Sequence, residues 1–209
     1  MEQRMKIGVL GGTFDPIHMG HLRVAEEVTA RLNLSETIFM PAGQPWLRAD
    51  SLISPAEHRV EMLRLALAGK PHFKLSTMEV DRPGPTYTVD TMAELKRQLG
   101  PAVELFFILG GDNLTQLPQW HEPSRLIELC RLVAVPRVGC YPDIDISSLD
   151  AAIPGLSGRV ILLDEPCIDI NASKIRQRVS RGLSIHNLVP EAVERYIKEY
   201  RLYESRIRP

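Results

Sequence analysis

The sequence is poor in cysteine and has no long apolar run. Its three cysteines, Cys130, Cys140 and Cys167, form no C-x-x-C pair, and any pairing leaves one thiol over. We therefore expect reduced thiols in a cytoplasmic protein. The first apolar stretch is too short for a signal peptide. No run approaches the roughly 18 apolar residues of a membrane span, so we expect no membrane partner.

The sequence also has no large excess of charge of either sign. Its formal net charge is −1, which argues against a general nucleic-acid binder. Residues 170–209 are the exception, with nine Lys and Arg against four Asp and Glu. The 209 residues, 44% of them hydrophobic, suit a single domain spanning 1–209. We expect 170–209 to be a basic, helical C-terminal part of that unit.

Strand and helix patterns alternate along the chain. The predicted strands are 6–10, 37–42, 73–80, 103–109, 131–137 and 159–164, and the predicted helices are 21–32, 54–69, 89–99, 122–130, 173–181 and 190–200. This alternation predicts an α/β fold: a Rossmann-like, doubly wound parallel sheet with helices on both faces. In such sheets, ligands bind beyond the carboxyl ends of the strands. The loops after 6–10 and after 103–109, and the one before 173–181, should therefore meet.

Two segments contain residues that are typical of helix ends or of loops. The helix at 54–69 is predicted to have Ser54 as its N-cap, Pro55 at its first position and Gly69 as its stop. Residues 138–158 are rich in Gly, Pro, Ser and Asp, which is typical of a long surface excursion.

The loop after the first strand, "LGGTFDPIHMGHL" (10–22), has the most unusual chemistry. Gly11 and Gly12 would let a ligand approach the backbone closely. The following helix start favours an anion, because its backbone N–H groups and dipole point at the loop. His18 and His21 are three residues apart, and each ring can donate to a phosphate oxygen. The pattern predicts a phosphate site.

Other sites fit this loop less well. It is not G-x-G-x-x-G, which disfavours a nicotinamide-dependent dehydrogenase, and no Lys follows the glycines as in a P-loop. Two histidines can ligate zinc, but no third ligand stands nearby in the sequence. For either histidine alone, a helix-capping role is the simpler alternative.

The string G-G-T-F-D-P-x-H-x-G-H-L resembles the signature of the H-x-G-H nucleotidylyltransferases, and more closely that of the bacterial nicotinate-nucleotide adenylyltransferase family. The resemblance extends over nearly the full chain. Residues 82–92, 109–120 and 170–179 are similar to further family segments, in the same order. Two departures stand out: Asn171 replaces the usual Ser, and Leu47 replaces a His.

The resemblance implies adenylyl transfer from ATP to nicotinate mononucleotide, giving deamido-NAD and pyrophosphate. His18 and His21 would be catalytic, and Mg²⁺ would be carried by ATP, with no protein ligand assigned. The implied ATP-binding residues are Gly11, Gly12, Thr13, His18, His21, Gly110, Asp112, Ser173 and Arg176. The implied mononucleotide-binding residues are Thr13, Phe14, Arg48, Thr86, Tyr87, Thr88, Trp120 and Arg137.

Several of these residues have a plain structural alternative. Asp112 suits ribose hydroxyls, but it is equally suited to be a helix N-cap. Trp120 offers a flat face to the pyridine ring, although tryptophan is more often a core residue. For Thr88 the alternative is a helix cap, and for Arg48 or Arg137 taken alone it is a solvated surface residue.

Three other functions stay open at this point: adenylyl transfer to nicotinamide mononucleotide, transfer to phosphopantetheine, and nucleotide-dependent regulation without turnover. Residues 82–88 with Trp120 favour a flat aromatic acid over a flexible thiol. Intact His18, His21 and Arg176 argue against a regulator. The sequence gives no oligomeric state.

Overall fold

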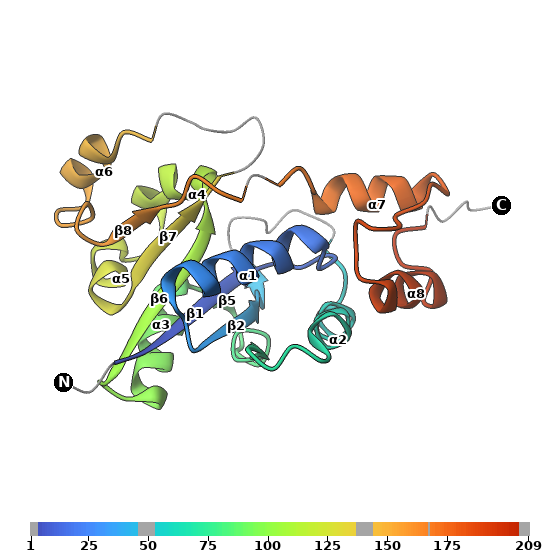
Figure 1. The fold of residues 1–209 in the computed structure, drawn as a ribbon, viewed down its shortest axis with the longest axis horizontal. Helices are drawn as coiled ribbons and strands as arrows, with labels where there is room; N and C mark the ends of the chain where they lie inside the picture. Colours follow the sequence, from blue (N-terminus) through green and yellow to red (C-terminus); the bar gives the residue numbers. More distant parts are fainter. Residues whose placement is uncertain (1–3, 46–52, 137–143, 167, 205–209) are drawn as a thin grey trace.

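The computed structural model describes residues 4–45, 53–136, 144–166 and 168–204. A six-stranded sheet forms the centre of the molecule, with every neighbouring pair of strands parallel and the strand order β4-β2-β1-β6-β7-β8 (Figure 1). Its strands are β1 (Met5–Gly12), β2 (Glu36–Pro41), β4 (Phe73–Leu75), β6 (Val103–Gly110), β7 (Arg131–Val135) and β8 (Val160–Leu162). The direction of winding reverses between β1 and β6. This confirms the predicted doubly wound α/β fold.

Helices cover both faces of this sheet. The bounds are α1 (Met19–Leu32), α2 (Ala56–Leu67), α3 (Thr88–Leu99), α4 (Gly111–Thr115), α5 (Pro123–Leu129), α6 (Ile146–Ala152), α7 (Ala172–Ser180) and α8 (Glu191–Glu199). Buried side chains of α1, α2, α7 and α8 share one hydrophobic cluster, and those of α3, α4 and α5 share the other. None of the described helices is long and apolar enough to cross a membrane.

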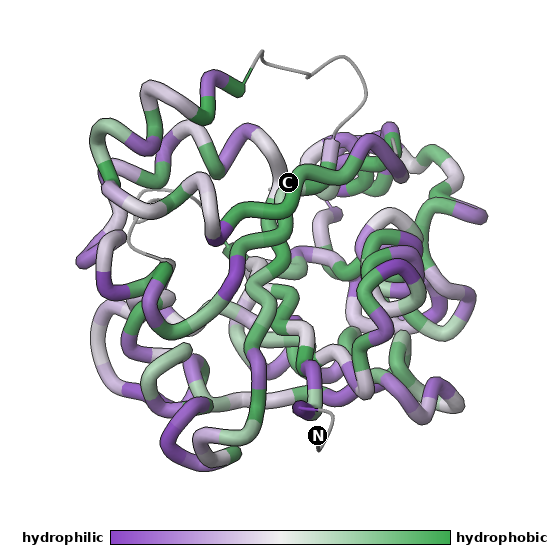
Figure 2. The backbone as a smooth tube through the Cα atoms, turned by 60° about the vertical axis from the view of Figure 1, so that its left-hand side comes forward, coloured by the Kyte–Doolittle hydropathy of each residue, from purple (hydrophilic) through white to green (hydrophobic). Residues whose placement is uncertain are grey.

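The central strands β1 and β6 are mostly apolar because both of their faces are buried. In β6, Phe106 and Ile108 face one cluster, while Leu105, Phe107 and Leu109 face the other. This is the period of two that a strand imposes on its side chains. In Figure 2 the hydrophobic colour is continuous along segments in the middle of the molecule, and much of the hydrophilic colour lies around them.

The C-terminal helices pack on the same cluster as the N-terminal half. Ile175 of α7 and Val193 and Ile197 of α8 are buried there. In Figure 1, α8 lies beside α2, and the chain passes from β8 over to α7. Residues 172–199 therefore share a core with the beginning of the chain.

A second, two-stranded sheet was not predicted. The strands β3 (Gln44–Pro45) and β5 (Pro85–Thr86) pair in parallel. Gly43 directly precedes β3, and a Cβ at this position would lie 2.1 Å from the carbonyl oxygen of Glu79. The backbone approach at Gly43 therefore leaves no room for a side chain, and it fixes where residues 44–45 meet residues 85–86.

Three sequence predictions were wrong in detail. The strand predicted at 73–80 ends at Leu75. Asp81 then donates its backbone N–H to the carbonyl of Thr77 (2.9 Å), and the Thr77 hydroxyl donates to the Asp81 carboxylate (2.7 Å). These local bonds favour a turn over a ladder.

The excursion predicted for 138–158 contains helix α6. Its N-cap, Asp145, accepts hydrogen bonds from the backbone N–H groups of Ser147 and Ser148, at 3.0 and 3.1 Å. Ile153 and Leu156 then bury themselves in the second hydrophobic cluster. The Asp and Ser that suggested a loop are in fact the cap of a short helix.

The N-cap predicted at Ser54 was also wrong, because α2 begins at Ala56 with Pro55 as its N-cap. Ser54 has other partners. Its N–H donates to the Asp15 carboxylate (3.1 Å), and its carbonyl accepts from Arg59 (3.1 Å). Gly69 was correctly placed just after the helix, with a φ of +78°.

Candidate active site

Residues 11–21, called the phosphate loop from here on, join β1 to α1. His18 is the N-cap of α1, with extended backbone angles, and its side chain is 6% exposed. The helix therefore begins at Met19, two residues earlier than predicted. The first backbone N–H groups of α1 and its positive dipole end lie where β1 ends, which is the geometry of an anion site.

His21 forms part of the cap of α1. The backbone N–H of His18 donates to Nδ1 of His21 at 3.3 Å. Because Nδ1 accepts this bond, the ring proton of a neutral His21 resides on Nε2. The two imidazoles are stacked, with centroids 3.6 Å apart, and Phe14 meets His21 edge-on at 4.9 Å. Capping and ligand binding are thus compatible roles for this pair.

Phe14 is a core residue. Its side chain is 2% exposed and its φ is +51°, in the left-handed region. A Cβ at Gly12 would lie 3.2 Å from the Phe14 ring, so Gly12 is needed for this packing as well. Any contact of Phe14 with a mononucleotide must therefore come from its backbone.

Arg176 brings α7 onto the phosphate loop. Its Nη1 donates to the carbonyl of Asp15 at 2.6 Å, and its Nη2 donates to the hydroxyl of Ser173 at 3.2 Å. Arg176 is half-buried and Ser173 is exposed. The loop after β1 and the start of α7 therefore meet, as predicted from the parallel sheet.

A buried arginine, Arg59, forms hydrogen bonds with the backbone of the phosphate loop. Arg59 of α2 is 2% exposed and donates to the carbonyls of Thr13 (3.0 Å) and Ala42 (2.8 Å) as well as to Ser54. Burial lowers the pKa of Arg59, and the neighbouring Asp15 carboxylate opposes this effect. Arg59 was missed because a lone Arg in a helical pattern gives no signal of burial.

The end of β6 lies beside the end of β1 in the sheet. Gly110 is the N-cap of α4, and Asp112 lies in the first turn of that helix. The N-cap alternative for Asp112 is therefore wrong. A Cβ at Gly11 would lie 3.0 Å from the Phe107 ring of β6, so the two strand ends are closely packed.

The segments 42–45, 82–88 and 120–121 are called the acceptor loops from here on, and they contain the predicted residues Thr86, Tyr87, Thr88 and Trp120. The Tyr87 and His121 rings lie 4.3 Å apart, which joins two of these segments. Trp120 is half-buried and meets Phe107 edge-on at 6.1 Å. Its Nε1 is buried and has no hydrogen-bond partner among the described residues. Trp120 thus packs on the core residue Phe107 and has a buried N–H donor without a hydrogen-bond acceptor among the described residues.

Glu79 contacts the acceptor loops through its backbone at Gly43, and it contacts α3 through its carboxylate. Its carboxylate accepts from the Thr91 hydroxyl at 2.7 Å, and Arg82 donates to the same hydroxyl at 3.2 Å. Burial raises the pKa of Glu79, while the bond from Thr91 and the charge of Arg82 partly offset it. Thr86 is 6% exposed, so its side chain supports the loop. Tyr87, with no side-chain cap bond, is the N-cap of α3, so the capping role for Thr88 is wrong.

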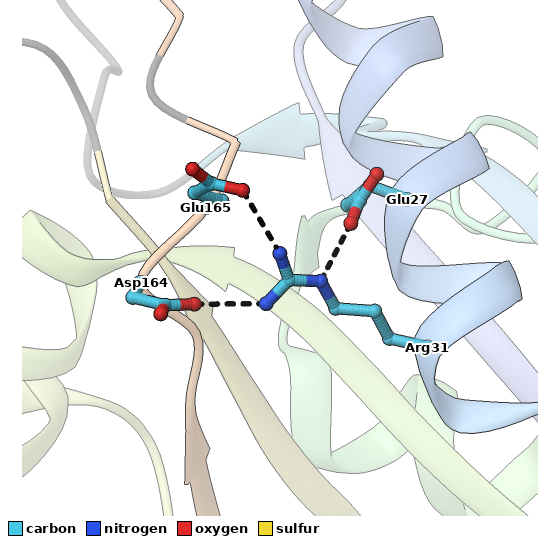
Figure 3. Close-up of polar contacts among 4 residues, drawn as sticks. All are labelled: Glu27, Arg31, Asp164 and Glu165. Atoms are coloured by element: carbon cyan, nitrogen blue, oxygen red, sulfur yellow. Dashed lines mark hydrogen bonds and ion pairs between the residues drawn. The ribbon is translucent and has the colours of Figure 1, made fainter.

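The segment between β8 and α7 is held against α1 by an ion cluster. Arg31 donates to Glu27 (2.5 Å), Asp164 (2.8 Å) and Glu165 (3.1 Å), as Figure 3 shows. The hydrogen bonds to Glu27 and Asp164 raise the pKa of Arg31. The cluster is exposed, so its energy is modest.

Asn171, a departure from the family pattern, caps α7. Its side-chain oxygen accepts from the backbone N–H groups of Ser173 (2.8 Å) and Lys174 (3.4 Å). Asn is as good an N-cap as Ser, so this departure preserves the helix start that presents Arg176. Arg48, Arg137 and Leu47 lie outside the described residues.

The fold and these loops together define a class. A parallel sheet with a helix start and two stacked histidines at its switch point, and with polar groups at the end of β6, is typical of a nucleotide-binding α/β protein. Comparison with known proteins makes this more specific. Residues 9–178 match the family model described as cytidylyltransferase-like.

Relatives identify the family more closely. A protein of Dehalococcoides mccartyi named probable nicotinate-nucleotide adenylyltransferase is 53% identical, covering 95% of this chain and 97% of its own. A protein of Thermomicrobium roseum with the same name is 47% identical, covering 96% and 92%. This chain therefore belongs to the nicotinate-nucleotide adenylyltransferase family, as the motifs predicted.

Solved structures confirm the fold. Plasmodium falciparum nicotinic acid mononucleotide adenylyltransferase complexed with NaAD matches with a TM-score of 0.77 at 22% identity, covering 95% of this chain and 97% of that one. The same enzyme complexed with APC matches with a TM-score of 0.74. The doubly wound arrangement is thus shared over nearly the whole chain.

Proposed function

We propose that this member of the nicotinate-nucleotide adenylyltransferase family transfers the adenylyl group of ATP to nicotinate mononucleotide, releasing pyrophosphate and forming nicotinate adenine dinucleotide. The observation that supports this most directly is the phosphate loop. It places a helix start, two stacked histidines and Arg176 on one strand end. The names of relatives up to 53% identical agree with it.

The reaction is an in-line displacement. A phosphate oxygen of the mononucleotide attacks the α-phosphorus of ATP, and the bond from that phosphorus to the bridging oxygen of pyrophosphate breaks. Negative charge then grows on the departing pyrophosphate, so catalysis requires positioning and charge stabilisation more than acid–base chemistry. No covalent enzyme intermediate is needed.

His21 supplies charge stabilisation in this proposal. With Nδ1 engaged by the His18 backbone, the Nε2–H of His21 is the ring donor toward a phosphate oxygen. The stacked His18 ring limits how far His21 can turn. Such preorganised donors stabilise the transition state because they need no reorientation as charge develops.

Arg176 would bind the phosphate chain of ATP, and Asp112 would bind its ribose. Arg176 is anchored by Nη1 on the Asp15 carbonyl and by Nη2 on the Ser173 hydroxyl, and its remaining N–H donors suit a phosphate chain. Asp112 lies in the first turn of α4, where its carboxylate suits ribose hydroxyls. Gly11, Gly12, Thr13, Gly110 and Ser173 would contribute backbone or hydroxyl contacts.

The acceptor loops would bind the mononucleotide. Trp120 would stack on the pyridine ring, and the N–H groups of residues 86–88 would meet the nicotinate carboxylate. That recognition would favour the acid over the amide, because an amide lacks the negative charge that these donors stabilise. Arg48 and Arg137 remain proposed partners of the mononucleotide phosphate.

Mg²⁺ would enter with ATP. Among the residues that the structure describes, no group of three or more His, Cys, Asp or Glu is placed to hold a metal ion. Mg²⁺ commonly keeps several waters and is bound through substrate phosphates. We therefore propose that ATP oxygens hold it and that it neutralises the charge of the triphosphate.

A pyrophosphate-release assay tests this function. ATP is supplied with nicotinate mononucleotide, nicotinamide mononucleotide or phosphopantetheine in turn, with and without Mg²⁺, and His21→Ala serves as the control for contaminating activity. We expect release that depends on Mg²⁺ and is fastest with the nicotinate form. No release with any acceptor would contradict an enzymatic role, and faster release with either of the other acceptors would reassign the substrate.

A further inference from the structure

Tyr203 lies after α8, near the end of the described chain, yet it contacts the phosphate loop. Its hydroxyl donates to Oδ1 of Asp15 at 2.6 Å, across 188 residues of sequence. The adenylyl-transfer mechanism above uses neither of these two side chains. Tyr203 has a positive φ of 65°, so the chain turns sharply at this position to deliver the ring.

Asp15 accepts hydrogen bonds at both carboxylate oxygens and at its backbone carbonyl. Its side chain is 3% exposed, its second carboxylate oxygen accepts from the Ser54 backbone (3.1 Å), and its carbonyl accepts from Arg176. A carboxylate buried this deeply needs its donors, because losing one leaves a charged group poorly solvated. Asp15 is therefore a fixed point of the loop that leads to His18.

The charges around Asp15 also connect it to the ATP site. Arg59 interacts with its charge and bonds the carbonyl of Thr13, two residues earlier. Burial raises the pKa of Tyr203, and the charge of Asp15 raises it further. The hydroxyl thus keeps its proton at neutral pH and stays a donor. Residues 13–15 are in this way held by Arg59, Arg176 and Tyr203, from three separate elements.

We propose that Tyr203 is a positioning residue for adenylyl transfer, which holds Asp15 so that the phosphate loop presents His18, His21 and Arg176 in reactive geometry. This inference rests on the proposed function. Reactivity is sensitive to displacements of about 1 Å, so a small shift of this loop slows the reaction even where substrates still bind.

The test removes only the hydroxyl. We expect Tyr203→Phe to lower kcat about tenfold while the KM for nicotinate mononucleotide stays within about twofold. Tyr196→Phe is the matched control: it lies seven residues earlier, and it loses a hydrogen bond between its hydroxyl and His58 (2.9 Å) away from the phosphate loop. Assays are run well below the melting temperature of each variant, with the folded fraction measured by circular dichroism.

A double-mutant cycle separates positioning from general destabilisation. If Tyr203 acts through Asp15, the double variant Tyr203→Phe/Asp15→Asn should lose no more kcat than Asp15→Asn alone. Additive losses would overturn the inference, as would an unchanged kcat in Tyr203→Phe or a loss equal to that of Tyr196→Phe. If Tyr203→Phe fails to fold, loss of turnover in folded Asp15→Asn supports the inference and full turnover overturns it. Absence of turnover in the wild-type chain would instead contradict the proposed function, and this inference with it.

Discussion

The phosphate loop and the acceptor loops face the same end of the sheet but are built differently. Residues 14–18 of the phosphate loop are all buried, and side chains from α2, α7 and the C-terminal segment bond to the backbone or carboxylate of residues 13–15. The acceptor loops are held by a ladder of two residue pairs, by the close approach at Gly43 and by a Tyr87–His121 contact.

This contrast agrees with what each substrate would require of the loops that bind it. Charge develops along the triphosphate, where rigid donors give the largest gain. In the proposed function, the acceptor would be bound by an aromatic face and a few hydrogen bonds, which tolerate looser loops. Substitutions in the phosphate loop should therefore change kcat, and substitutions in the acceptor loops should change the KM of one substrate.

The largest effect is expected from His21→Ala. Loss of one preorganised donor to the transition state should lower kcat by about 10²- to 10³-fold. Steady-state kinetics at saturating ATP and mononucleotide measure it. His72→Ala, at an exposed position, is the control. A kcat that stays at the wild-type value in His21→Ala would contradict the proposal that this loop stabilises the transition state.

Arg59→Leu should come next, because Arg59 joins the two regions through the carbonyls of Thr13 and Ala42. The buried carbonyls lose their donor, and we expect the free energy of unfolding to fall by about 2–3 kcal/mol. The melting temperature should drop by roughly 5–10 °C. Arg64→Leu on the same helix is the matched control, because its ion pair with Glu61 is exposed. Equal losses in the two variants would show that Arg59 has no special role.

Trp120→Ala should raise the KM for the mononucleotide far more than the KM for ATP. Loss of stacking on an aromatic side chain costs about 1–3 kcal/mol, or roughly 5- to 150-fold in binding. Trp120→Phe keeps an aromatic face and should lose less. Equal rises in both KM values would make Trp120 a purely structural residue and would weaken the contrast between the two regions.

The smallest effect is expected from Asn171→Ala, at the start of α7. Losing an N-cap costs about 1 kcal/mol, measured as the free energy of unfolding in urea. Asn171→Ser should restore most of it, since both residues cap well. If Asn171→Ser is as unstable as Asn171→Ala, the amide has a role other than capping.

The acceptor side shows where sequence reasoning was limited. The loop 82–88 was predicted to lie with Trp120, and the Tyr87–His121 contact confirms the neighbourhood. The β3–β5 pairing and the approach at Gly43 could not be predicted. Strands of two residues are too short for a hydrophobic period, and a glycine's missing side chain gives no clue to which backbone will fill the space.

The sequence by itself determined the sheet, its parallel winding, the strand ends where the site lies and the family. Apolar periodicity and local motifs encode these features because each depends on residues close together in the chain. Only the tertiary structure decided that Arg59 and Tyr203 meet the buried Asp15 of the phosphate loop. These residues are up to 188 positions apart, so the sequence gives no sign that folding will bring their polar groups together away from water, where each of them needs a partner.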